Sequence, residues 1–319
     1  LYLRGRHHLN RRTDCALNLA VECFENAVRA DPEYAEAYAG IADALVLLAG
    51  YGNRSPQSVM PRAKEAALRA IRLNDSIAEA HTSLGLVHAV YDWDWPAAER
   101  EFRHAIACNP CYSFAHMAYA HACLCPQERF EECFAEFDKA MELDPLSAVW
   151  PAMAALSRHL SGDSQGGIKY VDQALSLQPG FYLPLWVRAR ILEAQGNLPE
   201  ALECFRQAAN AAEDTPFLAA HYAKSLAQSG RVAEARKMLY ELRNMPRHRY
   251  VSPLEFAIVH IGLGENNNAL DWLEKAVQER CSRLSWYRLG PTFEPLWEHP
   301  RFKRLMARVA PEVAAAATA

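Results

Sequence analysis

The feature that most constrains this chain is a 34-residue period in its second half. Small residues follow each marking glycine by five positions, and bulky residues follow those by four. The columns are Gly162, Gly196, Gly230 and Gly264; Gly167, Ala201, Ala235 and Ala269; and Val171, Phe205, Leu239 and Leu273. A period of this length indicates a repeat architecture, in which each unit buries its apolar face on its neighbours. We therefore predict one elongated stack, although 319 residues would otherwise suggest about two globular domains.

Within each unit the spacing predicts two helices joined by a turn. Ala201, Phe205 and Ala208 share one helical face at i, i+4 and i+7. The marking glycine lies between the two helical stretches, where a positive φ ends the first helix. The small residue lets the two helices approach closely, and the bulky residue fills the space towards the next unit.

The first half carries the same pattern with insertions. The ends of its second helices are marked by proline, which blocks helix continuation. These marks are Asp31-Pro32, Asn109-Pro110, Asp144-Pro145 and Gln178-Pro179, with Asn74-Asp75 in the same place without proline. We predict a partial unit at 1–34, then seven units at 35–77, 78–112, 113–147, 148–181, 182–215, 216–249 and 250–283, and a capping segment with a frayed tail at 284–319.

These residues resemble the tetratricopeptide repeat (TPR) family. Ala80 to Gly85 and Ala98 to Pro110 match one unit of that family closely. The resemblance implies an all-α fold, an α-solenoid in which helix-turn-helix units stack into a right-handed superhelix. Asp75 and Glu213 depart from the pattern by replacing the closing proline, and Cys133 takes a small-residue position.

A narrower resemblance concerns context. The segments Tyr2 to Asn10, Tyr91 to Trp95 and Asp271 to Ala276 look like parts of the sensory repeat regions of bacterial multidomain regulators. In that group the repeats follow a winged-helix DNA-binding domain, a Ser/Thr kinase or a nucleotide cyclase. Because the chain opens at Leu1 without an initiator Met, we expect an N-terminal effector domain to be absent from this segment.

Composition removes several classes of function. An apolar fraction of 51% excludes a disordered tail, and no apolar run approaches the roughly 20 residues of a membrane span. A net charge of −4 argues against nucleic acid or an anionic membrane as the partner of this segment. The odd number of cysteines favours reduced thiols and a cytoplasmic location.

No motif for chemistry stands out. The chain has no phosphate-binding loop, no His-Glu-x-x-His and no Gly-x-Ser-x-Gly, so we expect neither catalysis nor a cofactor. Cys108, Cys111, Cys123 and Cys125 would suit zinc, but a helix of roughly three turns separates the two pairs. We expect no metal site there, and a redox or metal role for these thiols stays open. His81 and His88 have no acidic helper in the sequence and are interpreted as core or surface residues.

The resemblance implies a binding site in the concave groove lined by first helices. Carried over position by position, the groove residues are Asp43, Thr82, Leu86, Met117, His121, Leu156, His159, Trp186, Arg190, Lys224, Leu254 and Ile258. Trp186 with Arg190 and Lys224 would suit a carboxylate or an aromatic group. The Lys and Asn clamp of chaperone-binding members is not found, which disfavours that role.

Three functions stay open. The leading hypothesis is a non-catalytic interaction or sensory module of a bacterial signalling or transcription regulator, with a peptide or partner protein in the groove. The second is a sensor that holds a small molecule inside the superhelix. The third is an enzyme, which the sequence disfavours because no convergent acid–base set is visible. On the first hypothesis, we expect Trp186→Ala and Arg190→Glu to weaken partner binding with helicity intact.

Overall fold

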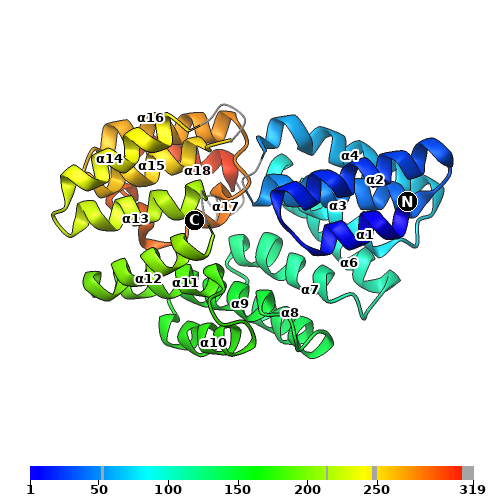
Figure 1. Cartoon of the computed structure of the whole chain (residues 1–319), viewed down its shortest axis with the longest axis horizontal. Helices are drawn as coiled ribbons and strands as arrows, with labels where there is room; N and C mark the ends of the chain where they lie inside the picture. Colours follow the sequence, from blue (N-terminus) through cyan, green and yellow to red (C-terminus); the bar gives the residue numbers. More distant parts are fainter. Residues whose placement is uncertain (52–53, 213–214, 246–249, 311–319) are drawn as a thin grey trace. The chain divides into compact units, whose positions relative to one another are not determined.

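The computed structural model describes residues 1–51, 54–212, 215–245 and 250–310. All regular secondary structure in these residues is helical, which confirms the predicted all-α class. The chain divides into two compact units, Leu1–Cys123 and Leu124–Ala319 (Figure 1).

The first unit is a series of helical hairpins. Consecutive helices pack against each other, α1 on α2, α3 on α4 and α5 on α6. The elements are α1 (Tyr2–Asn10), α2 (Asp14–Ala30), α3 (Ala35–Gly50), α4 (Pro56–Leu73), α5 (Ala78–Val87), the π-helical η1 (His88–Asp92), α6 (Trp95–Cys108), α7 (Ser113–Ala118) and the π-helical η2 (Tyr119–Leu124), whose last residue belongs to the second unit.

The second unit continues the hairpins, with α9 on α10, α11 on α12, α13 on α14 and α15 on α16. Its elements are the 3-10 helix η3 (Cys125–Gln127), α8 (Phe130–Leu143), α9 (Val149–Leu160), α10 (Ser164–Leu177), α11 (Tyr182–Ala194), α12 (Leu198–Ala211), α13 (Pro216–Gln228), α14 (Val232–Arg243), α15 (Pro253–Gly262), α16 (Asn266–Gln278), α17 (Leu284–Tyr287), the 3-10 helix η4 (Pro291–Leu296) and α18 (Pro300–Val309).

The glycines of the 34-residue period end first helices as predicted. Gly162, Gly196, Gly230 and Gly264 have φ between +71° and +89°. In earlier hairpins a residue with a side chain holds the same left-handed turn, with φ of +52°, +58° and +60° at Arg12, Trp93 and Glu128. The structural period therefore extends beyond the glycines that reveal it in the sequence.

The predicted core columns are buried. Small residues on second helices are fully buried where the first helix crosses, and so are most of the bulky residues four positions later. Examples are Ala98, Ala201, Ala235 and Ala269, and Phe102, Phe137, Val171, Phe205 and Leu273. Burial of these side chains contributes most of the stabilisation of each hairpin, at about 25 cal/mol per Å² of apolar surface.

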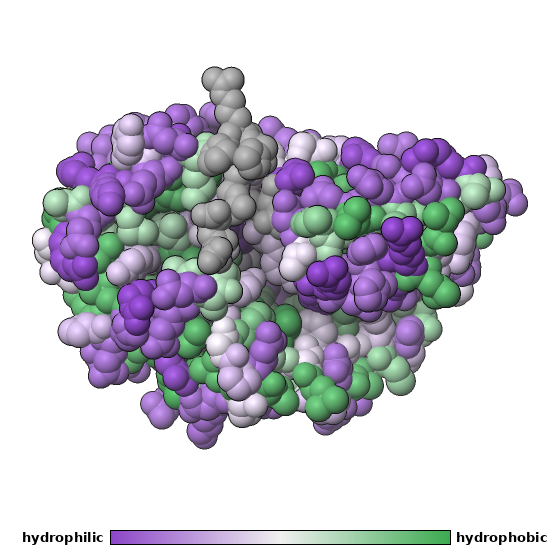
Figure 2. All heavy atoms as spheres, viewed as in Figure 1, coloured by the Kyte–Doolittle hydropathy of each residue, from purple (hydrophilic) through white to green (hydrophobic). Residues whose placement is uncertain are grey.

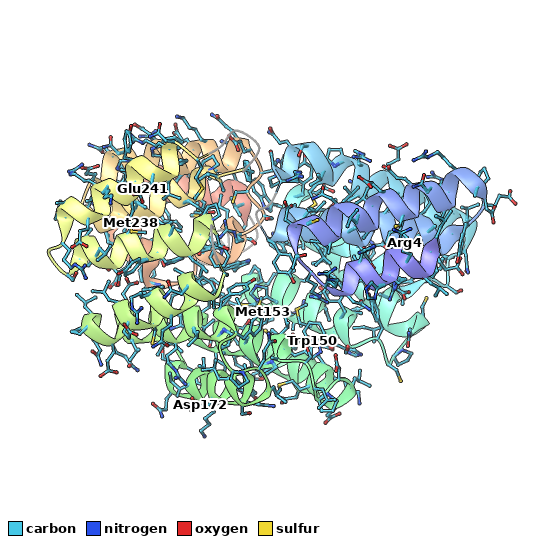
Figure 3. All side chains as sticks on the ribbon, viewed as in Figure 1. Arg4, Trp150, Met153, Asp172, Met238 and Glu241 are labelled. Atoms are coloured by element: carbon cyan, nitrogen blue, oxygen red, sulfur yellow. The ribbon has the colours of Figure 1, made fainter. Side chains whose placement is uncertain are left out.

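The outer surfaces are mixed. Figure 2 shows hydrophilic and hydrophobic residues interspersed over the visible face of each unit. Asp172 on α10 is an example of the outer polar surface and forms an ion pair with Arg188 of α11 (Figure 3). Among the described residues, every helix is too short or too polar to span a bilayer.

Candidate functional site

The residues predicted to line a groove all lie on the first helices of the hairpins. In the first unit they belong to α3, α5, α7 and η2, and in the second to α9, α11, α13 and α15. All of them except the half-buried Leu86 are buried. The sequence therefore places these residues on the expected helices, but the structure does not leave them as an open wall.

In the first unit, the polar members of this set have partners inside the protein. The Ser83 hydroxyl donates a hydrogen bond to the Asp43 carboxylate, and Thr82 Oγ1 donates to the Ala78 carbonyl at 2.8 Å. Burial raises the pKa of Asp43 to about 7, against the effect of the Ser83 hydrogen bond. Burial also lowers the pKa of His121 to about 3 and keeps this imidazole neutral at pH 7.

In the second unit, Trp186 and Arg190 of α11 are in contact, and Lys224 lies on the neighbouring first helix α13. The Arg190 guanidinium lies 4.9 Å from the centre of the Trp186 ring. Lys224 Nζ donates to Glu193 Oε2 at 2.6 Å, so its charge is already paired. All three side chains are buried. Within the described part of the chain, Arg190 Nη1 and Nη2 have no hydrogen-bond partner.

A later segment of the same chain packs over Arg190 and shields it from solvent. Residues 283–290, here called the resident segment, run across successive first helices of the second unit. Arg283 pairs with Glu255 of α15 and lies over the Phe217 ring of α13. Tyr287 Oη is hydrogen-bonded to His221 Nε2 of α13 at 2.5 Å.

The remaining contacts continue in the same direction. The Arg190 guanidinium of α11 lies 5.2 Å from the centre of the Tyr287 ring. Gly290 lies against Arg190 and Leu160 of α9, where an added Cβ would be 2.9 Å from Arg190 Nη2. Arg288 donates to the Pro126 carbonyl of η3 and pairs with Glu128 at 3.2 Å. The resident segment thus crosses α15, α13, α11, α9 and η3 in turn.

Most of the resident segment falls within 284–319, the predicted capping segment. We predicted that 284–319 caps the last repeat. Helix α18 does pack on α16, and Arg301 pairs with Asp271 and Glu274 at 2.7 and 2.8 Å. The resident segment, which precedes α18, lies over the first helices. Its Tyr287 contacts His221 and Arg190, and its Arg288 pairs with Glu128.

Several buried nitrogen atoms around Arg190 lack hydrogen-bond partners. They are Arg190 Nη1 and Nη2, Trp186 Nε1, His159 Nε2 and His221 Nδ1. Burial, and secondarily the Arg190 charge, lowers the pKa of His159 to about 3. The Arg190 and Trp186 nitrogens are hydrogen-bond donors. Unsatisfied buried donors cost free energy, so an acceptor group would be bound favourably here.

A separate pocket lies among α12, α13 and α14, with Met238 and Glu241 of α14 in its wall (Figure 3). Its volume is about 200 Å³, and its lining is mostly small or apolar. Typical ligand pockets begin near 300 Å³. This pocket has fewer polar groups to bind a ligand than the region of unsatisfied nitrogens around Arg190.

The cysteines are free thiols. Cys123 and Cys125 are buried, whereas Cys111 is exposed. Among the described residues, the side chains with metal-ligand spacing are instead Asp75, His81 and His104. Sequence reasoning missed this group, because its members come from a turn and two helices. Asp75 in place of a closing proline was the signal that could have found it.

Comparisons with known proteins agree with the hairpin architecture. No family model matches the chain. The structure of a human IFIT1 dimer with m7Gppp-AAAA superposes with a TM-score of 0.64 at 17% identity, covering 85% of this chain and 69% of that one. A segment of 65 residues is 35% identical to a TPR repeat-containing protein of Methanocaldococcus jannaschii, covering 20% of this chain and 19% of that protein. The chain has a TPR fold.

Two further matches concern context. Over 149 residues, 47% of its length, the chain is 26% identical to the transcriptional regulator HilA of Salmonella typhimurium. The match covers 27% of HilA, so the chain spans well under half of this relative. The structure of the APC/C hetero-tetramer Cut9–Hcn1 superposes with a TM-score of 0.57 at 12% identity, over 86% of this chain and 52% of that one.

Proposed function

We propose that this TPR chain is a non-catalytic interaction module that binds a peptide or partner-protein segment along the first helices of its second unit. The TPR fold supports this function, since stacked helix pairs present extended inner surfaces to their partners. The partner-binding residues are then those on α9, α11, α13 and α15, with Trp186 and Arg190 at the centre.

The resident segment is the observation that carries the proposal. It shows that these first helices hold a short stretch of chain through an aromatic residue, a cation and a glycine. Tyr287 reaches His221 and stacks near Arg190, while Arg288 pairs with Glu128. A partner that presents an aromatic residue next to a basic one would use the same contacts by displacing this segment.

A peptide added in trans tests the proposal. The probe is a fluorescent peptide of residues 282–292, and the protein is the full chain with Tyr287→Ala, in which the resident segment has lost its anchor. We expect the peptide to bind this variant at least about tenfold more tightly than the unmodified chain, whose own segment competes for the site.

Two controls keep this test specific. The same peptide with Tyr287→Ala should bind at least about tenfold more weakly to the variant chain. Adding Glu142→Gln on α8 should change nothing, because that exposed side chain pairs only with Lys139 of its own helix among the ion pairs found in the described residues. Equal binding of both peptides, with native circular dichroism of the variant, would show that the first helices are not the binding surface.

The buried setting also changes the variants that are informative. Trp186 packs edge-on against Phe217 and His221 at 5.4 Å between ring centres and is only 2% exposed. Its replacement by Ala would open a cavity and cost about 3–5 kcal/mol of stability. Trp186→Ala is therefore a poor probe of partner binding, contrary to the expectation that it would leave the fold intact.

We assign the module to a bacterial transcription regulator, as the resemblance to regulator repeat regions and the match to HilA support. In that setting the chain is cytoplasmic, and a separate N-terminal domain would contact DNA. The expected outcome is that this chain alone fails to retard duplex DNA in a gel, whereas the natural full-length polypeptide retards it. Retardation by the chain alone would contradict the assignment.

A second function is favoured by a different observation. The unpartnered Arg190 guanidinium and its neighbouring N–H groups suit the carboxylate or phosphate of a small anionic ligand. A panel of dicarboxylates, tricarboxylates and phosphate would be screened by thermal shift, with Arg190→Met as the matched variant. A shift that Arg190→Met abolishes supports a small-molecule sensor, and the lack of any shift in the unmodified chain rejects it.

A further inference from the structure

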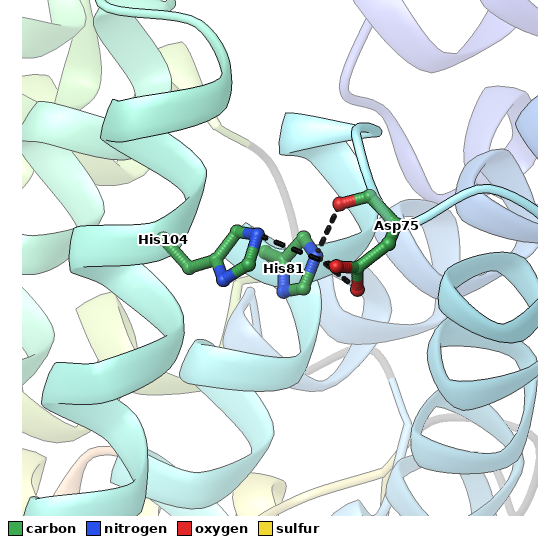
Figure 4. Close-up of side chains that lie close together, drawn as sticks. All are labelled: Asp75, His81 and His104. Carbon is green, nitrogen blue, oxygen red and sulfur yellow. Dashed lines mark hydrogen bonds and ion pairs between the residues drawn. The ribbon is translucent and has the colours of Figure 1, made fainter.

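Three donor side chains of the first unit converge outside the surface described above. Asp75 lies in the turn between α4 and α5, His81 on α5 and His104 on α6 (Figure 4). One ligand atom from each lies within 4.8 Å of the others. His81 Nε2 is 3.5 Å from Asp75 Oδ1, and His104 Nε2 is 3.8 Å from Asp75 Oδ2.

Hydrogen bonds on both ring nitrogens fix the orientation of the His81 imidazole. Its Nδ1 is hydrogen-bonded to Glu101 Oε2 at 2.7 Å, and its Nε2 faces the Asp75 carbonyl at 2.9 Å. Metal-binding histidines usually have such a carboxylate on the second ring nitrogen, which sets the tautomer and directs the free nitrogen towards the metal. The His104 ring stacks on His81 with 4.1 Å between the centres, and the Nε2 atoms of both rings face the Asp75 carboxylate.

A comparison with the next repeat shows which of these contacts are common to both repeats and which occur at Asp75, His81 and His104 alone. His116 follows His81 by 35 residues, and its Nε2 faces the Pro110 carbonyl at 3.1 Å. A histidine bound to the preceding turn is thus a shared feature of the two repeats. In the second of them, however, Pro110 and Lys139 stand 35 residues after Asp75 and His104. The Asp75 carboxylate and the His104 imidazole therefore have no equivalent in the next repeat. The hydrogen bond from histidine to the preceding turn forms there without them.

We propose that Asp75, His81 and His104 bind one divalent transition-metal ion of the Zn²⁺ type, through the Asp75 carboxylate and the two Nε2 atoms. Ligand atoms at zinc distances lie roughly 3.4 Å apart along a tetrahedral edge, and the two Nε2 atoms lie 3.5 Å from Asp75 Oδ1 and 3.8 Å from Asp75 Oδ2. Imidazole ligands favour zinc or its neighbours over Mg²⁺ or Ca²⁺. On binding, the metal replaces the hydrogen bond between His81 Nε2 and the Asp75 carbonyl.

The site has an entry path and a structural consequence. The Asp75 and His104 side chains are 69% and 45% exposed, so the ion reaches them from solvent and a water takes the fourth position. The bound ion links the turn after α4 to α5 and α6, and so joins two adjacent repeats. It therefore stabilises their packing, in the way that any ligand of the folded state does.

The test uses the full chain, stripped with a chelator and titrated with Zn²⁺ alone by calorimetry and thermal denaturation. We expect one equivalent of this type, with a rise in Tm on binding. Asp75→Asn and His104→Gln, both at exposed positions, should each weaken binding by at least about tenfold and abolish the rise in Tm. His116→Gln is the matched control from the next repeat and should leave Zn²⁺ affinity unchanged.

A cysteine variant completes the design. Cys108 follows His104 by one helical turn, and its thiol lies 3.7 Å from the Asp75 carbonyl. Cys108→Ser should keep the Zn²⁺ affinity within about twofold of the unmodified chain, because three other ligands hold the ion. Binding that survives both Asp75→Asn and His104→Gln, or that Cys108→Ser abolishes, would overturn the proposal, and so would the lack of any Zn²⁺-dependent rise in Tm.

Discussion

At the scale of the residue, a left-handed backbone position follows most of the first helices in the described part of the chain. Glycine supplies it in the later hairpins, and Arg12, Trp93 and Glu128 supply it in earlier ones at the cost of backbone strain. The 34-residue period is therefore clearest in the repeats where glycine occupies the left-handed position.

Gly196→Ala tests this backbone requirement. An added Cβ at Gly196 would meet no atom within 4 Å, so its effect arises from φ of +79° alone. We expect the free energy of unfolding to fall by about 1 kcal/mol, measured by denaturant titration. Gly50 also has open space around its Cβ position but no positive φ. Gly50→Ala should keep or raise stability, and equal losses in both variants would contradict the explanation.

A second residue-scale prediction concerns Asp43. Its folded pKa of about 7 lies above the ordinary value of 3.8, chiefly because it is buried. Between these values the folded state binds more protons than the unfolded state, so this residue makes stability fall as pH rises from about 4 to about 7. The Ser83 hydroxyl, Glu79, Arg6 and Arg12 modify the shift without reversing it.

Asp43→Asn isolates that contribution. The difference in unfolding free energy between the unmodified chain and the variant should fall by at most about 4 kcal/mol across this window. His121 and His159 act in the opposite sense, since their lowered pKa values make stability rise with pH, but they are common to both proteins. Parallel stability curves from pH 4 to pH 7 would refute the assigned pKa.

At the scale of the element, close helix packing depends on glycine, which has no side chain to separate the helices. The Phe24 ring of α2 is fully buried between Gly5 of α1 and Gly40 of α3, where a Cβ would be 2.5 and 2.7 Å from ring atoms. The three helices approach one another at this ring. A larger residue at either glycine therefore forces a shift of the buried ring or of a helix.

Gly40→Ala should cost about 1–3 kcal/mol of unfolding free energy. Gly85→Ala, which meets the Phe102 ring at 3.0 Å, should cost less, as measured by the urea midpoint. Combining Gly40→Ala with Phe24→Leu relieves the overlap, so the double variant should lose less than the sum of the single losses. Additive losses would show that the ring does not make the contact.

At the scale of the whole molecule, repeats contact mainly their neighbours, and local damage should stay local. Hydrogen exchange of Gly196→Ala should be faster in α11 and α12, less so in α9 and α13, and unchanged in α3 and α4. The helices α3 and α4 lie several repeats away along the chain. A uniform increase over all helices would instead show that the repeats unfold as one cooperative unit.

Much of this architecture was predictable because a helical hairpin is a local structure. The period, the turn glycines and the buried columns at Ala201 and Phe205 all depend on residues within one or two repeats. The sequence also placed Trp186, Arg190 and Lys224 on neighbouring first helices. It did not show that Glu193 pairs with Lys224, because that contact joins two repeats through flexible side chains.

The amino-acid sequence by itself determined the all-α class, the helical repeats and the helices that carry the candidate residues, since these follow from spacing along the chain. Only the tertiary structure decided what those residues face. The resident segment reaches helices more than 60 positions away, as in the contact of Tyr287 with His221, and Asp75, His81 and His104 meet from three elements. Such contacts depend on how helices pack and how side chains are directed, and no period along the sequence records either.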